Sequence, residues 1–131
     1  MDDAALIAEA RRHVGVFDLA ASGLTAGSVA SALGTEAGHV YAGVCLDLAC
    51  GVGFCAEHAA VAAMLLARET VVAKIVAVTA GGVLPPCGRC RELLLQVDRR
   101  NAACAVLVAE GLAVPLGDLM PHPWLTPGAR V

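Results

Sequence analysis

The chain has 131 residues, of which 58% are hydrophobic and 16% charged, and its mean hydropathy is +0.72. This length suffices for one domain with its own hydrophobic core, so we expect a single domain over residues 1–131. A net charge of −3, with two Phe, one Tyr and one Trp, argues against a nucleic acid polymer as partner. Such polymers are bound by basic surfaces and stacking aromatic side chains.

The apolar residues form no run long enough for a membrane span. The longest run, Ala59 to Ala67, falls well short of the roughly 18 residues that a spanning helix needs. The start Met1-Asp2-Asp3 is acidic where a secretory signal is basic. We therefore expect a cytoplasmic protein, in which the six cysteines are ligands or buried thiols rather than disulfides. A small chain this apolar also predicts a homo-oligomer, because subunit contacts bury excess apolar surface.

The first part of the chain predicts a helix followed by an antiparallel hairpin. Apolar residues recur at three- and four-residue spacing from Asp2 to about Ala21, which is the period of a helix. Two apolar segments, 28–33 and 40–46, then flank a five-residue connection with glycine at each end. This arrangement is typical of a β-hairpin.

The remainder of the chain alternates helices and strands. The predicted elements are a loop over 47–54, a helix over 55–68, a buried strand over 71–79, a helix over 87–100, a strand over 104–109, and a short strand after Leu112. This order calls for right-handed crossovers and a sheet covered by helices, so the expected fold class is α/β.

Three cysteines and one glutamate lie at the starts of the two later helices. Pro85 and Pro86 favour an extended chain just before Cys87, so Cys87 begins a helix and Cys90 follows one turn later on the same face. Cys55 likewise begins a helix, and Glu57 lies two residues further on. We expect the two helix N-termini to lower the thiol pKa values, because they favour anions.

These residue types are those of a catalytic zinc site. Zinc held by three thiolates keeps a fourth position open for water, and nucleobase deaminases combine such a Cys₃ or His/Cys₂ set with a nearby Glu that moves protons. The predicted metal ligands are Cys55, Cys87 and Cys90, with Glu57 as the catalytic acid and base. His58, Arg89 and Arg91 are neighbours of the ligands that would draw charge from the sulfurs.

Two other interpretations of the cysteines stay open at this stage. A closed structural zinc site would need a fourth protein ligand, for which Cys50 and His58 are candidates. A redox pair formed by Cys87 and Cys90 would leave Cys55 and Glu57 without a role.

Two motifs, Cys55-Ala56-Glu57 and Pro86-Cys87-Gly88-Arg89-Cys90-Arg91, closely resemble those of the small tetrameric cytidine deaminases and their relative blasticidin-S deaminase. Further similarity lies in 28–32, 41–44 and 119–121, so the resemblance extends over nearly the whole chain from Ser28. It implies a three-layer α/β/α fold with a mixed sheet, bound Zn²⁺, and a homotetramer with sites at subunit contacts. It also implies hydrolytic deamination of a cytosine ring.

The resemblance also marks positions that contact the substrate in that family. The residues that hold the ribose in nucleoside-specific members are Cys45 and Asp47 here, and a thiol cannot reproduce the amide donor and acceptor found there. Trp124 stands where the family places a C-terminal aromatic over the base; alternatively it fills an apolar groove. The implied substrate contacts are therefore Cys45, Asp47, Ala56 and Trp124, and the residues implied to tune the sulfurs are His58 and Arg91.

The predicted activity is zinc-dependent hydrolytic deamination of a cytosine nucleoside, such as cytidine, deoxycytidine or a modified analogue, with release of ammonia. One alternative is a deaminase for a cytosine antibiotic of the blasticidin-S type. Another is a structural zinc module without activity, which the altered Cys45 and Asp47 would explain. Editing of bases in nucleic acids conflicts with the acidic composition.

Overall fold

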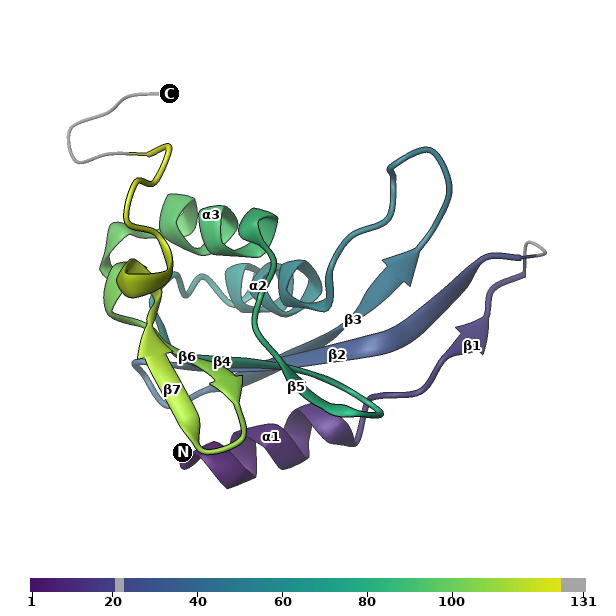
Figure 1. The fold of residues 1–131 in the computed structure, drawn as a ribbon, viewed down its shortest axis with the longest axis horizontal. Coiled ribbons are helices and arrows are strands. Elements are labelled where there is room, and N and C mark those ends of the chain that lie inside the picture. The colour runs from purple at the N-terminus through teal and green to yellow at the C-terminus, as the bar shows by residue number, and fades with distance from the viewer. Residues whose placement is uncertain (21–22, 126–131) are drawn as a thin grey trace.

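The computed structural model describes residues 1–20 and 23–125. Figure 1 shows the described chain as one twisted sheet with helices on both faces. The helices are α1 (Asp3–Arg11), α2 (Ala56–Leu66) and α3 (Gly88–Val97), with 3₁₀ turns η1 (Arg99–Ala103) and η2 (Leu116–Leu119). The strands are β1 (Phe17–Asp18), β2 (Thr25–Thr35), β3 (Val40–Asp47), β4 (Val72–Thr79), β5 (Gly82–Leu84), β6 (Ala105–Ala109) and β7 (Leu112–Pro115).

The sheet is mixed, as the family resemblance implied. Strand β2 pairs in antiparallel fashion with β1, β3 and β4, and β4 pairs with β5 in the same sense. Strands β4 and β6 run parallel, and β6 forms an antiparallel pair with β7. The parallel pair is the one joined by a helical crossover through α3, which agrees with the alternation expected from the sequence.

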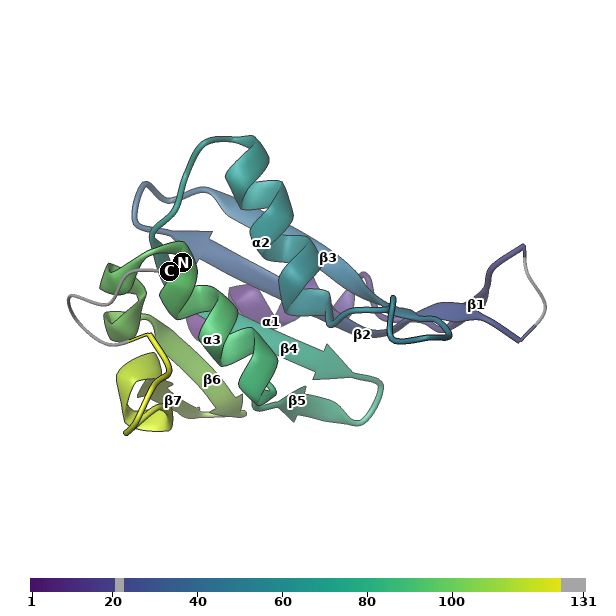
Figure 2. The same cartoon turned by 90° about the horizontal axis from the view of Figure 1, so that it is seen from above.

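The two faces of the sheet have separate hydrophobic cores, which makes the architecture three-layered. Helix α1 lies on one face, while α2 and α3 lie side by side on the other (Figure 2). Successive strand residues alternate between the layers, because side chains in a strand point to opposite faces. Ala32 and Val76 pack in the α1 layer, whereas Leu33 and Ile75 pack beneath α2 and α3. The predicted three-layer α/β/α fold is therefore confirmed.

The N-terminal helix is shorter than the sequence pattern predicted. It ends at Arg11, and strand β1 forms where the prediction placed a further helical turn. The Gly15 N–H donates to the Gly27 carbonyl over 2.9 Å, which ties this segment to β2. A Cβ at Gly27, whose φ is +86°, would lie 2.3 Å from the Gly15 oxygen, so the close approach requires glycine there. The last predicted helical residue, Ala21, lies outside the described residues.

The predicted hairpin and the later helices and strands are present with small changes at their ends. Cys55 and Cys87 are the N-caps of α2 and α3 rather than their first helical residues. Strand β5 was not predicted, because its glycine and the one before it were interpreted as a turn only. None of the helices in the described ranges has the length and hydropathy needed to span a membrane.

Candidate metal and active site

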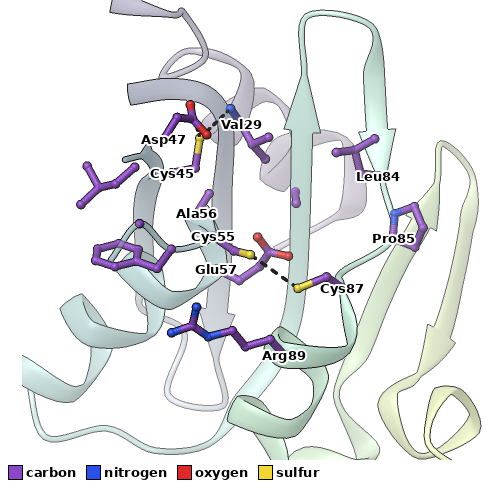
Figure 3. Close-up of a pocket in the computed structure, with 14 residues that line it drawn as sticks. Val29, Cys45, Asp47, Cys55, Ala56, Glu57, Leu84, Pro85, Cys87 and Arg89 are labelled. Carbon is purple, nitrogen blue, oxygen red and sulfur yellow. Dashed lines mark hydrogen bonds between the residues drawn. The ribbon is translucent and has the colours of Figure 1, made fainter. Parts of the chain in front are cut away.

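Two helices from different parts of the chain begin at the same place above the sheet. Cys55 precedes α2 with φ −71° and ψ 155°, and Cys87 precedes α3 with φ −67° and ψ 167°. Both residues are thus extended N-caps, and Figure 3 shows their side chains pointing toward each other. The arrangement follows from the layer order, because both helices cover the same face of the sheet.

The three predicted ligands form a compact triangle of sulfur atoms. The Sγ atoms of Cys55 and Cys87 are 3.5 Å apart, and those of Cys87 and Cys90 are 3.4 Å apart. The Sγ atoms of Cys55 and Cys90 lie within 4.8 Å of each other. Tetrahedral zinc with bonds of about 2.3 Å separates two sulfurs by about 3.8 Å. The triangle therefore fits a zinc ion with little adjustment.

His58 offers a further donor at the same place. Its Nδ1 lies 3.6 Å from the Cys90 Sγ, and the donor atoms of Cys55, His58 and Cys90 are all within 4.8 Å of one another. A Cys–His–Cys set and a three-cysteine set are thus both possible on distance. We favour Cys87 as the third ligand, since its sulfur contacts both other thiols, whereas His58 contacts only Cys90 among them.

The thiol pKa values differ from the sequence expectation. Burial raises the pKa of Cys55, and burial together with the Glu57 charge raises that of Cys90. Burial also acts against ionisation of Cys87, but the backbone N–H groups of Cys90 and Arg89 and the two neighbouring thiols lower its pKa overall. Lowered pKa values were expected at both helix N-termini, and only Cys87 has one. A divalent cation bound among the sulfurs would offset the effect of burial on these pKa values, because coordinating thiols are deprotonated.

Glu57 places a buried carboxyl group beside the thiols. It lies in the first turn of α2, and 4% of the residue is exposed. Burial raises the pKa of Glu57 above its ordinary range, although its own backbone N–H and the Cys90 thiol act in the opposite direction. Figure 3 shows the carboxylate between Cys55 and Cys87. A group held in this way can both accept and donate a proton.

A cavity of about 340 Å³ extends from the thiols and Glu57 to the end of β3. Six of the predicted site residues line it, namely Cys45, Asp47, Cys55, Ala56, Glu57 and Cys87. Its walls also include Phe54, at the end of the predicted 47–54 loop, and Val29, Leu84 and Pro85, which sequence reasoning missed. The residues that line the cavity come from five separate segments of the chain, and a cavity of this size suits a small organic ligand.

The far end of the cavity is a polar cluster joining β2 and β3. The Val29 N–H donates to the Cys45 Sγ over 3.3 Å, and the Ser28 Oγ lies 3.2 Å from the same sulfur. The hydroxyls of Ser28 and Thr25 donate to the Asp47 Oδ2 over 3.1 and 3.4 Å. Ser28 and Thr25 were not predicted as site residues, because only the strand register, in which Thr25 pairs with Asp47, reveals them.

The loop before Cys55 is held to β3 by a short bridge. Leu46 and Phe54 exchange backbone hydrogen bonds of 3.0 and 3.2 Å. A Cβ at Gly53 would lie 2.3 Å from the Leu46 oxygen, so glycine is needed for this approach. The bridge thereby sets the position from which Cys55 enters α2.

Two predicted residues, Arg91 and Trp124, do not line the cavity. Arg91 donates from Nε to the Pro86 carbonyl over 2.9 Å and from Nη1 to the Leu119 carbonyl over 3.2 Å, so it holds the approach to Cys87. The Trp124 backbone donates to the Glu92 carboxylate, and 66% of Trp124 is exposed. Trp124 does not line the cavity of its own chain. Its predicted contact with a substrate from another subunit stays a prediction.

Solved structures of cytidine deaminases are similar to this chain, although no family model and no curated protein sequence matches it. The cytidine deaminase of Mycobacterium tuberculosis is 26% identical over 96% of this chain and 99% of its own, with a TM-score of 0.79. That of Burkholderia pseudomallei is 27% identical over 95% and 100%, with a TM-score of 0.76. That of Bacillus anthracis, at 20% identity and a TM-score of 0.71, shows the shared fold.

The fold is therefore that of the cytidine deaminases, a mixed sheet between helical layers. The chain resembles the bacterial members of that group over nearly its whole length, and its Cys–His–Cys cluster fits the zinc-dependent family.

Proposed function

We propose that this protein is a zinc-dependent hydrolase that removes the amino group of a cytosine nucleoside or a related cytosine compound. The products are the uracil form and ammonia. The observation that carries this proposal is the buried Glu57 carboxyl beside three thiols at one end of a 340 Å³ cavity. Similarity to bacterial cytidine deaminases supports the same reaction type.

The residues that would hold the metal are Cys55, Cys87 and Cys90. Zinc in such a site acts as a Lewis acid that activates water for attack on the ring carbon bearing the amino group. The fold positions the metal ligands, because two helix N-termini place the thiols on one side of the cavity. Arg91 holds the chain ahead of Cys87 in place through the Pro86 carbonyl.

Glu57 would move the protons of the reaction. Its carboxylate takes a proton from the attacking water and gives it to a ring nitrogen, and then carries the second water proton to the departing amino group. The ring itself would lie against apolar walls formed by residues such as Val29, Phe54 and Leu84. These walls would cover the apolar faces of the ring beside the thiols and Glu57.

The decisive variant is Glu57→Gln, which keeps the shape of the side chain and removes its ability to shuttle protons. We expect the variant to bind zinc in the same ratio as the unmodified protein and to lose turnover of every cytosine compound. The control is Glu110→Gln, at an exposed glutamate paired with Arg11, which should keep full activity. A Glu57→Gln protein that releases ammonia at the normal rate would contradict the mechanism.

A second candidate function is a structural zinc module without activity. The 3.6 Å contact between His58 Nδ1 and Cys90 Sγ favours it, since His58 could close the coordination sphere as a fourth protein ligand. Such a protein would hold zinc tightly and release no ammonia from any cytosine compound. Loss of cytosine absorbance should be followed for cytidine, deoxycytidine, free cytosine and blasticidin S. That panel separates a nucleoside deaminase from an antibiotic deaminase as well.

We further propose that the chain assembles as a homotetramer. Exposed apolar side chains support this proposal, among them Phe17 at 53%, Leu66 at 78% and Leu112 at 52% exposure. Trp124 would then reach the cavity of a neighbouring copy. Light scattering at micromolar concentration tests the assembly, and a monomer mass would refute it.

A further inference from the structure

The end of the cavity opposite the thiols carries the carboxylate of Asp47. Asp47 is the last residue of β3 and is exposed. Its hydrogen bonds come from the hydroxyls of Ser28 and Thr25 and, over 3.7 Å, from the Cys45 thiol, and all three go to Oδ2. Within residues 1–20 and 23–125, no Lys, Arg or His forms an ion pair with it. Its Oδ1 is thus free to accept a hydrogen bond from a ligand.

Cys45 is a poor hydrogen-bonding partner for a ligand at this end of the cavity. Its sulfur is already engaged by the Val29 N–H and the Ser28 hydroxyl, and only 5% of Cys45 is exposed. A thiol is also a weak donor and a weak acceptor. Asp47 is therefore the strong polar group that this end of the cavity offers.

The charge of the whole cavity also favours a positively charged ligand group. Three thiolates around Zn²⁺ leave a formal charge of −1, and the Glu57 and Asp47 carboxylates make the cavity more negative. Arg89 is the cavity's basic residue, and Figure 3 shows it on the opposite side of the thiols from Asp47. A positive group near Asp47 would meet a negative potential, and no Lys, Arg or His of the described residues is paired with this carboxylate.

We infer that Asp47 selects cytosine compounds whose substituent, on the side away from the reacting amine, carries a positively charged amino group. This inference rests on the proposed function and names the class of its substrate. A carboxylate attracts an ammonium by the Coulomb interaction of two opposite charges as well as by a hydrogen bond, whereas a hydroxyl offers the hydrogen bond alone. The ion pair is exposed, so salt weakens it.

The test compares cytidine with its two analogues in which the primary hydroxyl or a ring hydroxyl of the sugar is replaced by an amino group. We expect at least one amino analogue to exceed cytidine in kcat/KM by about two- to fivefold at low salt, with the ratio falling toward one at high salt. Asp47→Asn should reduce the ratio to about one, and Asp47→Glu should keep a preference for the amine.

The matched control is Asp118→Asn, which removes one negative charge from an exposed residue in η2, away from the cavity. This variant should keep the preference of the unmodified protein. Equal kcat/KM values for cytidine and both amino analogues would overturn the inference and leave the deaminase proposal intact. So would a preference that Asp47→Asn does not change. Absence of ammonia release from every compound would refute the proposed function, and the inference with it.

Discussion

The thiols of Cys55 and Cys87, 32 positions apart in the chain, lie 3.5 Å from each other because each residue caps a different helix above the same sheet. Cys90, one turn into α3, completes the triangle with Cys87 over 3.4 Å. This contact turns two short motifs into one site that can hold a divalent cation.

The two possible ligand sets make opposite predictions for single variants. Cys87→Ser should weaken zinc binding by at least about 100-fold if the three cysteines are the ligands, because even changes in outer-shell partners cost about 10–100-fold. His58→Ala should then have the smaller effect. Zinc affinity by competition with a chelating dye measures both.

The control for this comparison is Cys50→Ser. Cys50 is exposed and was a candidate fourth ligand in the sequence, but it is not part of the metal-binding cluster found in the described residues. We expect unchanged zinc affinity for this variant. A stronger loss in His58→Ala than in Cys87→Ser would instead assign the metal to Cys55, His58 and Cys90.

Removal of zinc should destabilise the protein as well as stop turnover. Free metal at about a thousand times its Kd adds about 4 kcal/mol to the free energy of unfolding, which corresponds to a fall in Tm of roughly 15 °C on removal. Scanning calorimetry before and after chelation measures this shift. Zinc should restore both Tm and activity, whereas Mg²⁺, which prefers oxygen ligands, should restore neither. An unchanged Tm after complete chelation would show that the thiols do not bind the metal.

Gly53→Ala should lower both stability and activity. The added Cβ would lie 2.3 Å from the Leu46 oxygen and push apart the bridge between Leu46 and Phe54. We expect a loss of about 1–3 kcal/mol, typical of overpacking, together with reduced turnover because Cys55 moves. Urea unfolding and steady-state kinetics test the two effects. Gly34→Ala is the control, since a Cβ at Gly34 meets nothing within 4 Å.

Glu69 should make stability dependent on pH in the acid range. Its carboxylate accepts hydrogen bonds from Tyr41, from Thr35 over 2.7 Å and from His39 over 2.9 Å, and the Tyr41 bond is the largest cause of its lowered pKa. A pKa that is lower in the folded state stabilises the protein at pH values above the unfolded pKa. This contribution disappears as the pH falls through the folded pKa.

Glu69→Gln should therefore lower the free energy of unfolding at neutral pH and make it less dependent on pH below about 4.5, the ordinary value for a glutamate. Urea unfolding at several pH values gives both quantities. Glu110→Gln serves again as the control, and it should leave the acid dependence unchanged. If Glu69→Gln loses stability equally at all pH values, the lowered pKa is not the cause.

Several elements could be predicted because local rules decide them. The hairpin between β2 and β3 follows from two apolar segments around a connection bounded by glycines, and the structure has it. The prolines before Cys87 mark the start of α3 in the same local way. The helix predicted to about Ala21 was wrong past Arg11, because contact with β2 overrides the helical period there. Local periodicity does not show whether a segment will pair with a distant strand instead of forming a helix.

The sequence by itself determined that two metal-binding thiols lie together, since the spacing of Cys87 and Cys90 puts them one turn apart on any helix that begins there. Only the tertiary structure decided that Cys55 joins them, because that contact depends on α2 and α3 sharing one face of the sheet. It also decided that Ser28 and Thr25 hold the Asp47 carboxylate, through a strand register interrupted by an irregularity between Ala26 and Ala30. Register and layer packing arise from contacts between distant segments, and these contacts set the shape and charge of the cavity.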